Sequence, residues 1–175
     1  MNRMLWMDLE MTGLDPNTCH IIEIAAVVTD VHLSPLHQYH KVVYQPPEIL
    51  ETMDAWNQKT HSDSGLLAAI PNGTHIDSVE RDLVGFVDAY FENERPVICG
   101  NSIHQDRKFI DKYLPAFAQK LHYRMIDVSA FKQVFDCRYG ITFKKNGGHR
   151  AVDDILESIA ELNHYLSFIK LEVQS

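Results

Sequence analysis

The sequence predicts an α/β fold in which helices cover both faces of a mixed β-sheet. Apolar runs typical of strands come first, over residues 4–45, and are joined by connections of turn length. Helical patterns then alternate with short apolar runs through the rest of the chain. Short connections favour an antiparallel meander among the early strands, and the later alternation is typical of a sheet of mixed direction. The length of 175 residues suits one domain, residues 1–175.

The first half of the chain should supply three strands and two helical segments. The strands are predicted at residues 4–10, 21–29 and 40–45. The continuous apolar run at 24–28 favours a central place in the sheet for the second strand. A turn is expected over 11–17, which contains Gly, Asp, Pro and Asn, and Pro46-Pro47 should end the third strand. The helical segments are predicted at 48–62 and 64–69.

The second half should alternate helices with short strands. Helices are predicted at 78–91, 101–114 and 128–135 and from His149 onward, and strands at 96–100 and 123–127. Apolar residues recur at helical spacing in the first and last of these helices. Pro115 should end the helix that begins at Asn101-Ser102. Residues 139–148 end in Asn146-Gly147-Gly148, and we expect them to form a mobile loop.

The formal net charge of −8 limits the kind of nucleic acid that the chain could bind. Proteins that track long nucleic acids usually present a basic surface, because neutralised phosphates supply most of the non-specific affinity. An acidic chain lacks that source of affinity. A nucleic-acid substrate should therefore be short, and a compact pocket and metal ions should hold it.

Cysteine usage and hydropathy favour a cytoplasmic protein. The three cysteines, Cys19, Cys99 and Cys137, are odd in number and lack CxxC spacing, so we expect a reducing compartment without a disulfide framework. No apolar stretch approaches the ~18 residues of a membrane span. The amino terminus leads directly into a charged strand, so no signal peptide is expected.

Two carboxylates on the first predicted strand are the first candidates for a functional site. Side chains alternate across a strand, so Asp8 and Glu10 should share one side while Leu5, Met7 and Leu9 share the other. At roughly 6–7 Å, two carboxylates repel by about 2–3 kcal/mol at an effective dielectric near 20. A bound divalent metal is the simplest reason to place both on a half-buried strand.

The last predicted helix adds a histidine and another acid. Its apolar stripe is centred about 110° from Asp154 and about 150° from Asp153, so Asp154 should lie at the margin of the core and Asp153 in solvent. His149 follows two glycines, and an imidazole titrates near neutrality, which suits proton removal from water. An isolated Asp or His is usually a solvated residue. These two become candidates because they coincide with the other acids, including Asp106.

The pattern Asp8-x-Glu10, Asp106 and His149-x4-Asp154 resembles the histidine-containing branch (DEDDh) of the DEDD 3′→5′ exonuclease superfamily. The closer resemblance, over nearly the whole chain, is to the oligoribonuclease family. Five segments carry it: residues 6–15, 56–61, 99–106, 122–129 and 149–155. Many superfamily members have an aromatic residue before the third acid, whereas this chain has Gln105, as oligoribonucleases do.

This resemblance implies a ribonuclease H-like fold, a homodimer, and 3′→5′ hydrolysis of very short RNA, especially 5′-phosphorylated dinucleotides. It also implies two divalent metal ions, Mg²⁺ or Mn²⁺. Asp8 would bridge both ions, Glu10 and Asp154 would complete the site on the side of the nucleophile, and Asp106 would reach the other ion. His149 would deprotonate the attacking water.

The same resemblance implies a set of substrate contacts. Leu14 and Trp56 would form an apolar wedge that sandwiches the terminal bases, and His61 would contact a phosphate or sugar. Ser102, Arg124 and Ser129 would bind the 5′ phosphate, with Tyr123 arriving from the partner subunit. Without the resemblance, Trp56 would be as readily explained as a core residue. An arginine such as Arg124 would more commonly form a surface salt bridge.

Three other functions predict different features of the sequence. Another DEDDh exonuclease, acting on the 3′ ends of DNA or structured RNA, would be expected to carry a basic groove. A non-catalytic metal-binding adaptor domain would be expected to lack at least one of the five site residues, and all five are present. A glycosidase carboxylate pair would need neither a general-base histidine nor phosphate donors.

Overall fold

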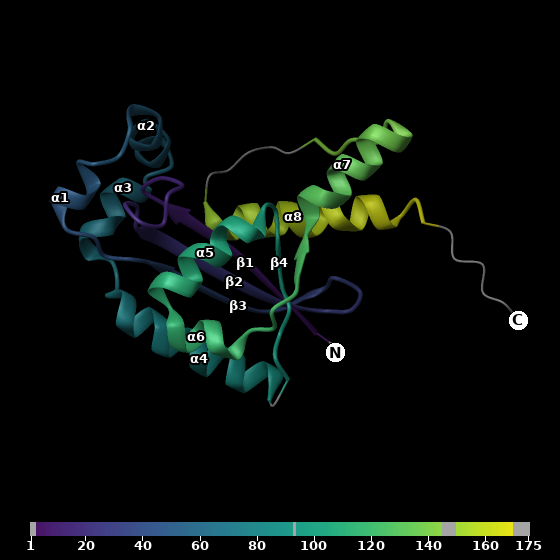
Figure 1. Ribbon diagram of the computed structural model, residues 1–175, viewed down its shortest axis with the longest axis horizontal. Helices are drawn as coiled ribbons and strands as arrows, with labels where there is room; N and C mark the ends of the chain where they lie inside the picture. Colours follow the sequence, from purple (N-terminus) through teal and green to yellow (C-terminus); the bar gives the residue numbers. More distant parts are fainter. Residues whose placement is uncertain (1–2, 93, 145–149, 170–175) are drawn as a thin grey trace, which may run out of the picture.

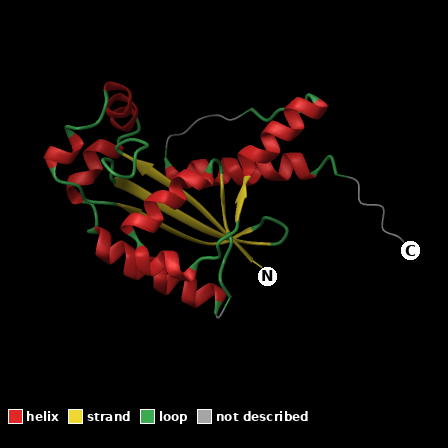
Figure 2. Ribbon diagram, in the orientation of Figure 1, coloured by secondary structure: helices red, strands yellow, loops and turns green. Residues whose placement is uncertain are grey.

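A five-stranded sheet forms the centre of the computed structural model, which describes residues 3–92, 94–144 and 150–169 (Figures 1 and 2). The strand order is β3-β2-β1-β4-β5. β1, β2 and β3 form an antiparallel meander, whereas β4 runs parallel to β1 and β5 parallel to β4. The predicted mixed sheet is therefore confirmed. The strands are β1 (Arg3–Met11), β2 (Ile21–Asp30), β3 (Pro35–Val42), β4 (Ile98–Gly100) and β5 (Met125–Asp127).

Helices cover both faces of this sheet, as predicted (Figures 1 and 2). α4, α5 and α6 pack on one face, and α7 and α8 pack on the other. The helices are α1 (Pro47–Leu50), α2 (Ala55–Asp63), α3 (Leu66–Ala69), α4 (Ile76–Phe91), α5 (Ile103–Tyr113), α6 (Pro115–Lys120), α7 (Val128–Tyr139) and α8 (Ala151–Leu166), and a 3₁₀ turn spans Ile70–Asn72. In the described part of the chain, no helix combines the length and apolar character needed to cross a membrane.

The alternation along β1 separates the hydrophobic core from the candidate site. Leu5, Met7 and Leu9 are buried in the core cluster shared with α4, α5 and α6. Trp6 points to the opposite face and packs in the cluster that contains Ile155 of α8. Because Asp8 and Glu10 follow Trp6 with period two, their side chains are directed to the α8 face.

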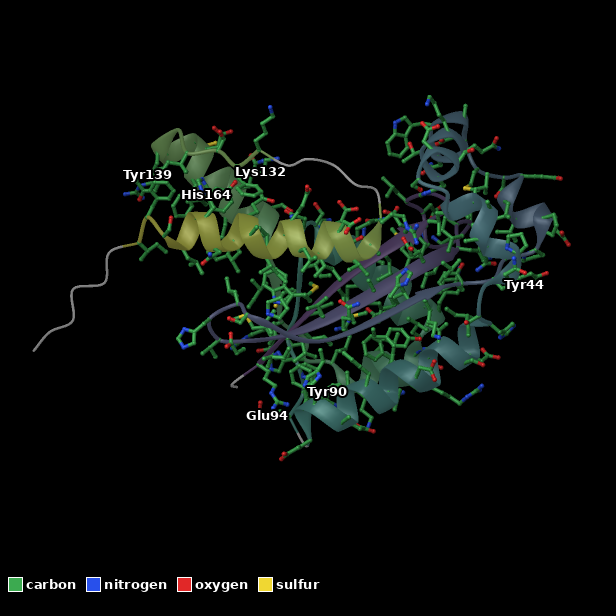
Figure 3. All side chains as sticks on the ribbon, turned by 180° about the vertical axis from the view of Figure 1, so that it is seen from behind. Tyr44, Tyr90, Glu94, Lys132, Tyr139 and His164 are labelled. Carbon is green, nitrogen blue, oxygen red and sulfur yellow. The ribbon has the colours of Figure 1, made fainter. Side chains whose placement is uncertain are left out.

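The far end of α8 is anchored by aromatic rings. The ring of Phe135 in α7 lies 5.6 Å from that of Tyr139 and 5.1 Å from that of Tyr165 in α8. Figure 3 shows Tyr139 and His164 together where the carboxyl ends of these two helices meet. Aromatic pairs at such spacing stabilise a fold by more than the burial of their surface alone would provide. This packing fixes the carboxyl end of α8, opposite the end that carries Asp154.

Several predicted boundaries in the first half were wrong. The third strand spans Pro35–Val42 rather than 40–45, because a tight turn returns the chain early. In that turn Asp30 Oδ1 accepts bonds from the backbone N–H groups of His32 (2.8 Å) and Ser34 (2.9 Å). The helical segment predicted at 48–62 is divided into α1 and α2, because Asp54 caps α2 by accepting a bond from the Asn57 N–H at 2.8 Å.

Boundaries in the second half also differed. Pro115 ends α5 as expected but also begins α6, which was not predicted; proline suits the first turn of a helix because that position needs no N–H partner. α7 continues to Tyr139, four residues beyond the predicted end, and stops at Gly140, whose φ of 64° is left-handed. Of the predicted loop at 139–148, residues 141–144 are irregular and 145–148 lie outside the described residues.

Candidate metal and catalytic site

The end of β1 lies beside the first turn of α8 (Figure 1). Three carboxylates converge there. Asp8, Glu10 and Asp154 each place one oxygen within 4.8 Å of the others. All three residues are half-buried, while the neighbouring Asp153 is exposed. The predicted choice of Asp154 over Asp153 is consistent with this exposure. Strand alternation and helix phase thus bring residues from opposite ends of the sequence into one group.

The electrostatics of this group favour a cation. Burial, the nearby charge of Asp154 and, more weakly, those of Glu23 and Asp106 raise the pKa of Glu10 to about 7. A carboxyl group whose ionisation is opposed so strongly gains from a positive partner. The candidate ligand atoms are all carboxylate oxygens, which suit a hard divalent cation rather than a soft metal. The cluster therefore fits a divalent metal site.

Asp106 lies beside this group on α5 rather than within it. The residue is buried, and its Oδ1 accepts a hydrogen bond from the backbone N–H of Leu9 at 3.0 Å. Leu9 lies between Asp8 and Glu10 on β1, so this bond attaches the fourth acid to the strand that carries the other two. Burial raises the pKa of Asp106 to about 7.

The last of the five predicted catalytic residues, His149, lies outside the described residues. The next residue, Arg150, is described, and its guanidinium binds Glu23 on β2. Glu23 is fully buried, and it was not among the predicted site residues. The signal was available, because an acid within the apolar run of β2 is unusual unless it is paired.

The residues predicted to stack on bases are exposed. Leu14 in the turn after β1 is 71% exposed, and Trp56 in the first turn of α2 is 66% exposed. Trp56 is therefore not a core residue. The side-chain amide of Gln105 donates to the backbone oxygen of Leu14 and holds the turn against α5. His61 is only 2% exposed, and its Nε2 lies 3.2 Å from the Met11 oxygen.

Two of the residues predicted to bind the 5′ phosphate are in contact. The hydroxyl oxygens of Ser102 and Ser129 lie 3.1 Å apart. Asp127 organises the pair, because its Oδ1 accepts bonds from the Ser102 N–H (2.9 Å) and the Ser129 hydroxyl (2.7 Å). Burial opposes ionisation of Asp127, but its hydrogen bonds from Ser129, His104 and Ser102 outweigh burial and lower its pKa.

Arg124 and Tyr123 lie just before β5 and contact each other within this chain. The guanidinium carbon of Arg124 is 5.4 Å from the centroid of the Tyr123 ring. Both residues are exposed, Tyr123 by 74%. Both side chains are therefore accessible to a ligand or to another molecule.

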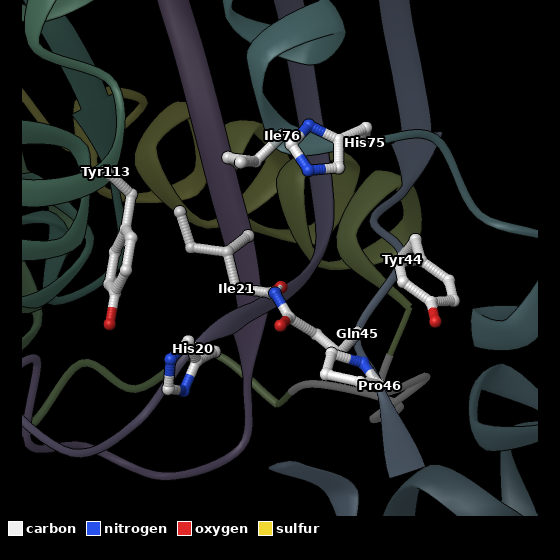
Figure 4. Close-up of a pocket in the computed structure, with 8 residues that line it drawn as sticks. All are labelled: His20, Ile21, Tyr44, Gln45, Pro46, His75, Ile76 and Tyr113. Atoms are coloured by element: carbon white, nitrogen blue, oxygen red, sulfur yellow. Dashed lines mark hydrogen bonds between the residues drawn. The ribbon is translucent and has the colours of Figure 1, made fainter. Parts of the chain in front are cut away.

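A cavity of about 320 Å³ opens elsewhere, at the start of β2 (Figure 4). None of the predicted site residues is among the described residues that line it. The lining residues are His20, Ile21, Tyr44, Gln45, Pro46, His75, Ile76 and Tyr113. The carboxylate group, rather than this cavity, therefore defines the candidate site.

Solved structures with the same architecture define the fold. The chain superposes on exonuclease I from E. coli in complex with a dA16 oligonucleotide with a TM-score of 0.74 at 12% identity, covering 95% of this chain and 41% of that one. For exonuclease I from Methylocaldum szegediense the TM-score is 0.68 at 14% identity, covering 96% and 41%. The chain thus spans well under half of those structures. The fold is ribonuclease H-like, as expected.

Sequence comparison then gives the family. The family model described as Exonuclease matches residues 5–162. Oligoribonuclease from Dichelobacter nodosus is 45% identical over 167 residues, which cover 94% of this chain and 93% of that protein. Oligoribonuclease from Neisseria meningitidis serogroup C is 41% identical over 169 residues, covering 94% and 90%. The chain belongs to this exonuclease family, and the expected resemblance to oligoribonucleases is confirmed.

Proposed function

We propose that the protein is a 3′→5′ exoribonuclease that degrades very short RNA, especially 5′-phosphorylated dinucleotides, to mononucleotides. The observation that carries this proposal is the convergence of Asp8, Glu10 and Asp154 within 4.8 Å, in a chain of the exonuclease family. The oligoribonuclease relatives, matched over nearly their full length, support short RNA as the substrate. The acidic net charge also favours a short substrate over a long one.

We propose that the four acids hold two divalent metal ions, Mg²⁺ or Mn²⁺. Asp8 would contact both ions, Glu10 and Asp154 would complete one site, and Asp106 would contribute to the other. Such ions supply charge stabilisation at the reacting phosphate and make a bound water more acidic. The raised pKa of Glu10 supports this assignment, because the metal-free cluster carries more negative charge than its surroundings accommodate.

We propose that an imidazole nitrogen of His149 accepts the proton of the attacking water. Its place in the sequence supports this role, since it directly precedes Arg150, the N-cap residue of the helix that carries Asp154. A histidine is suited to proton transfer near neutral pH because both of its protonation states are accessible there.

The contacts of Leu14 and Trp56 with the substrate are proposed because both side chains are exposed. Leu14 and Trp56 present apolar surface on which terminal bases can stack, and such stacking is worth about 1–3 kcal/mol per base. Because stacking tolerates any base, little sequence preference is expected. We also propose, from the resemblance to oligoribonucleases and not from exposure, that His61 contacts a phosphate or sugar of the bound RNA; in the structure its side chain is buried against the Met11 oxygen.

The 5′ phosphate would be held by Ser102, Ser129 and Arg124. The Ser102 hydroxyl can donate to the phosphate, and the Ser129 hydroxyl would do so by exchanging its bond to Asp127 for one to the phosphate. The arginine fork can bind a phosphate through two bonds. We propose a homodimer in which Tyr123 of one subunit completes the phosphate pocket of the other. A cap that binds a 5′ phosphate two nucleotides from the 3′ end would act as a ruler that favours dinucleotides.

Two further properties are proposed for the whole chain. Residues 1–175 would form a single exonuclease domain, which is supported by the match of the family model over most of that range. A cytoplasmic location is supported by the three cysteines, which are free in the structure.

A length series of 5′-labelled oligonucleotides tests the function. The protein should convert a 5′-phosphorylated RNA dinucleotide to mononucleotides with Mg²⁺ or Mn²⁺, should cleave a heptanucleotide more slowly, and should be inactive in EDTA. Faster cleavage of single-stranded DNA or of a structured RNA 3′ end would favour a different exonuclease of the same branch. No hydrolysis of any substrate with either metal would favour a non-catalytic role.

A further inference from the structure

We propose that Glu23 is a positioning residue, which holds the first turn of α8 against the sheet and thereby sets the place of Asp154 relative to Asp8 and Glu10. This inference rests on the proposed function and assigns a task to a residue outside the four acids and His149. The geometry that supports it is a set of hydrogen bonds between β2 and the start of α8.

Glu23 uses both of its oxygens in this set. Oε1 accepts bonds from Arg150 Nε at 2.9 Å and Arg150 Nη2 at 2.7 Å, and it lies 2.7 Å from His40 Nε2. Oε2 accepts a bond from the backbone N–H of Ala151 at 3.1 Å. Burial opposes ionisation of Glu23, but the bonds from Arg150, His40 and Ala151 outweigh it and lower the pKa. These bonds therefore favour the charged form of Glu23 and hold both of its oxygens.

These bonds replace the usual cap of the helix. An N-cap residue normally satisfies an early N–H of its helix with its own side chain. Among the described residues, the N-cap Arg150 makes no such bond to α8, and Glu23 of β2 binds the N–H of Ala151 instead. A carboxylate also interacts favourably with the positive end of a helix. The amino terminus of α8 is thus attached to the sheet through a side chain that is distant in sequence.

The residues that Glu23 binds, Arg150 and Ala151, are near Asp154 in the sequence, and Asp154 is the proposed metal ligand on α8. The backbone oxygen of Arg150 accepts the first helical bond from the N–H of Asp154 at 3.0 Å. Glu23 binds the side chain of the same Arg150, and the next residue through its backbone. Displacement of this turn would therefore move the Asp154 carboxylate away from the two acids on β1. His149 directly precedes the turn in sequence and would be affected with it.

The position of Glu23 is difficult to explain by fold stability alone. Glu23 lies directly opposite Glu10 in the β1–β2 ladder, so it adds negative charge beside a cluster that is already acidic. Like charges opposite each other destabilise a sheet. Arg150 offsets that charge, and Glu23 is not among the three carboxylates that converge within 4.8 Å.

The main test compares Glu23→Gln with a matched variant, Glu161→Gln. Glu161 is also buried and lies near the other end of α8, where it accepts bonds from Asn101 Nδ2 and the Tyr165 hydroxyl. Mn²⁺ binding to the metal-free protein is measured by titration calorimetry, and dinucleotide hydrolysis is measured separately. We expect Glu23→Gln to weaken Mn²⁺ binding and to lower kcat by about 10- to 100-fold each, as for partners that orient metal ligands. The KM for the dinucleotide should change little.

Glu161→Gln should lose stability with Mn²⁺ affinity and kcat close to those of the wild type. If Glu23→Gln does not fold, Arg150→Met serves in its place, because it removes the side-chain contact and leaves the bond from Glu23 to the Ala151 N–H. Arg150→Lys, which keeps the charge, should retain more of the Mn²⁺ affinity than Arg150→Met. Amide hydrogen exchange at residues 151–155 should accelerate in Glu23→Gln and Arg150→Met.

The possible failures are distinguishable. Wild-type Mn²⁺ affinity and kcat in Glu23→Gln, or in Arg150→Met if that variant is used, would overturn the positioning role and leave the proposed function intact. Equal losses in Glu23→Gln and Glu161→Gln would assign Glu23 to general stability and would also overturn it. A wild-type protein that neither binds Mn²⁺ nor cleaves RNA would overturn the proposed function itself.

Discussion

Asp106 on α5 accepts a hydrogen bond from the backbone N–H of Leu9, the residue between Asp8 and Glu10 on β1. Buried polar groups need a hydrogen-bond partner, and this bond supplies one to the Asp106 carboxyl group. The fourth acid is thus fixed to the same strand as the first two, and its role can be tested without disturbing the core that Leu9 occupies on the other side.

Replacing Asp106 with asparagine should remove activity but preserve the fold. The amide oxygen can still accept the bond from Leu9, and burial no longer has to accommodate a charge. We expect turnover to fall by about two orders of magnitude or more, as when one electrostatic stabiliser of a transition state is removed. Thermal stability without metal should hold or rise. Asp111→Asn on the exposed side of the same helix is the control, and near-normal turnover in Asp106→Asn would contradict the assignment.

Glu10 should make the metal-free protein less stable as pH rises. Burial first, and then neighbouring acids, raise its pKa from 4.5 to about 7 in the folded state. Between these values the folded protein holds a proton that the unfolded chain has released, so stability falls with increasing pH by up to about 3 kcal/mol. Glu10→Gln should lack this contribution and should be relatively more stable than the wild type above pH ~7.

Urea unfolding in EDTA between pH ~5 and ~8 measures this effect. The free energies of unfolding of wild type and Glu10→Gln should diverge as pH rises through this range. Added Mg²⁺ should raise the free energy of unfolding of the wild type more at high pH than at low pH. Parallel curves for wild type and Glu10→Gln would show that Glu10 ionises normally in the folded protein.

His149→Ala should separate proton transfer from metal binding. If His149 is the general base, the wild-type rate should rise through a neutral pKa and then level off. The variant should lose most of its activity at neutral pH and yet bind Mn²⁺ with nearly wild-type affinity. His32→Ala, at an exposed turn position, is the matched control. A pH–rate profile unchanged by His149→Ala would assign His149 a structural role.

Trp56→Ala should weaken substrate binding without loss of stability. Its side chain is 66% exposed, so little core packing is removed. Loss of one stacked base should raise the dinucleotide KM by roughly 5- to 150-fold, the equivalent of about 1–3 kcal/mol. Tyr139→Ala, another exposed aromatic at the far end of α7, should leave the dinucleotide KM unchanged, although it removes a ring contact with Phe135. A large fall in melting temperature for Trp56→Ala with an unchanged KM would contradict the stacking role.

Arg124→Ala tests the proposed recognition of the 5′ phosphate. The variant should impair dinucleotide cleavage by the equivalent of about 2–5 kcal/mol at most, as for a desolvated charge contact. A heptanucleotide should be affected much less, and removing the 5′ phosphate from the dinucleotide should mimic the substitution. Lys108→Ala, an exposed cation on α5, is the control. Equal losses for short and long RNA would rule out the length ruler.

The features predicted well from sequence are those that a repeating pattern encodes. Alternation along β1 separates Leu5, Met7 and Leu9 from Asp8 and Glu10, and the apolar stripe of α8 distinguishes Asp154 from Asp153. These patterns need only one element at a time. They sufficed for the sheet, for both helical layers and for three acids of the candidate site.

The features that sequence could not provide depend on contacts between distant segments. The attachment of α8 by Glu23 joins β2 to a helix far along the chain, and the approach of Ser102 to Ser129 depends on Asp127 at the end of β5. Side-chain hydrogen bonds that cap a helix or close a turn were also not predicted where they interrupt a periodic pattern. Asp54 divides one predicted helix, and the turn at Asp30 starts β3 early.

The most direct test of the central claim is hydrolysis of a 5′-labelled, 5′-phosphorylated RNA dinucleotide by wild type and Asp8→Asn, each titrated with Mn²⁺. The account predicts that wild type releases mononucleotides only when Mn²⁺ or Mg²⁺ is present, and that Asp8→Asn stays folded but shows no measurable cleavage at any Mn²⁺ concentration. Hydrolysis by the wild type in EDTA, or near-normal turnover by Asp8→Asn, would contradict it.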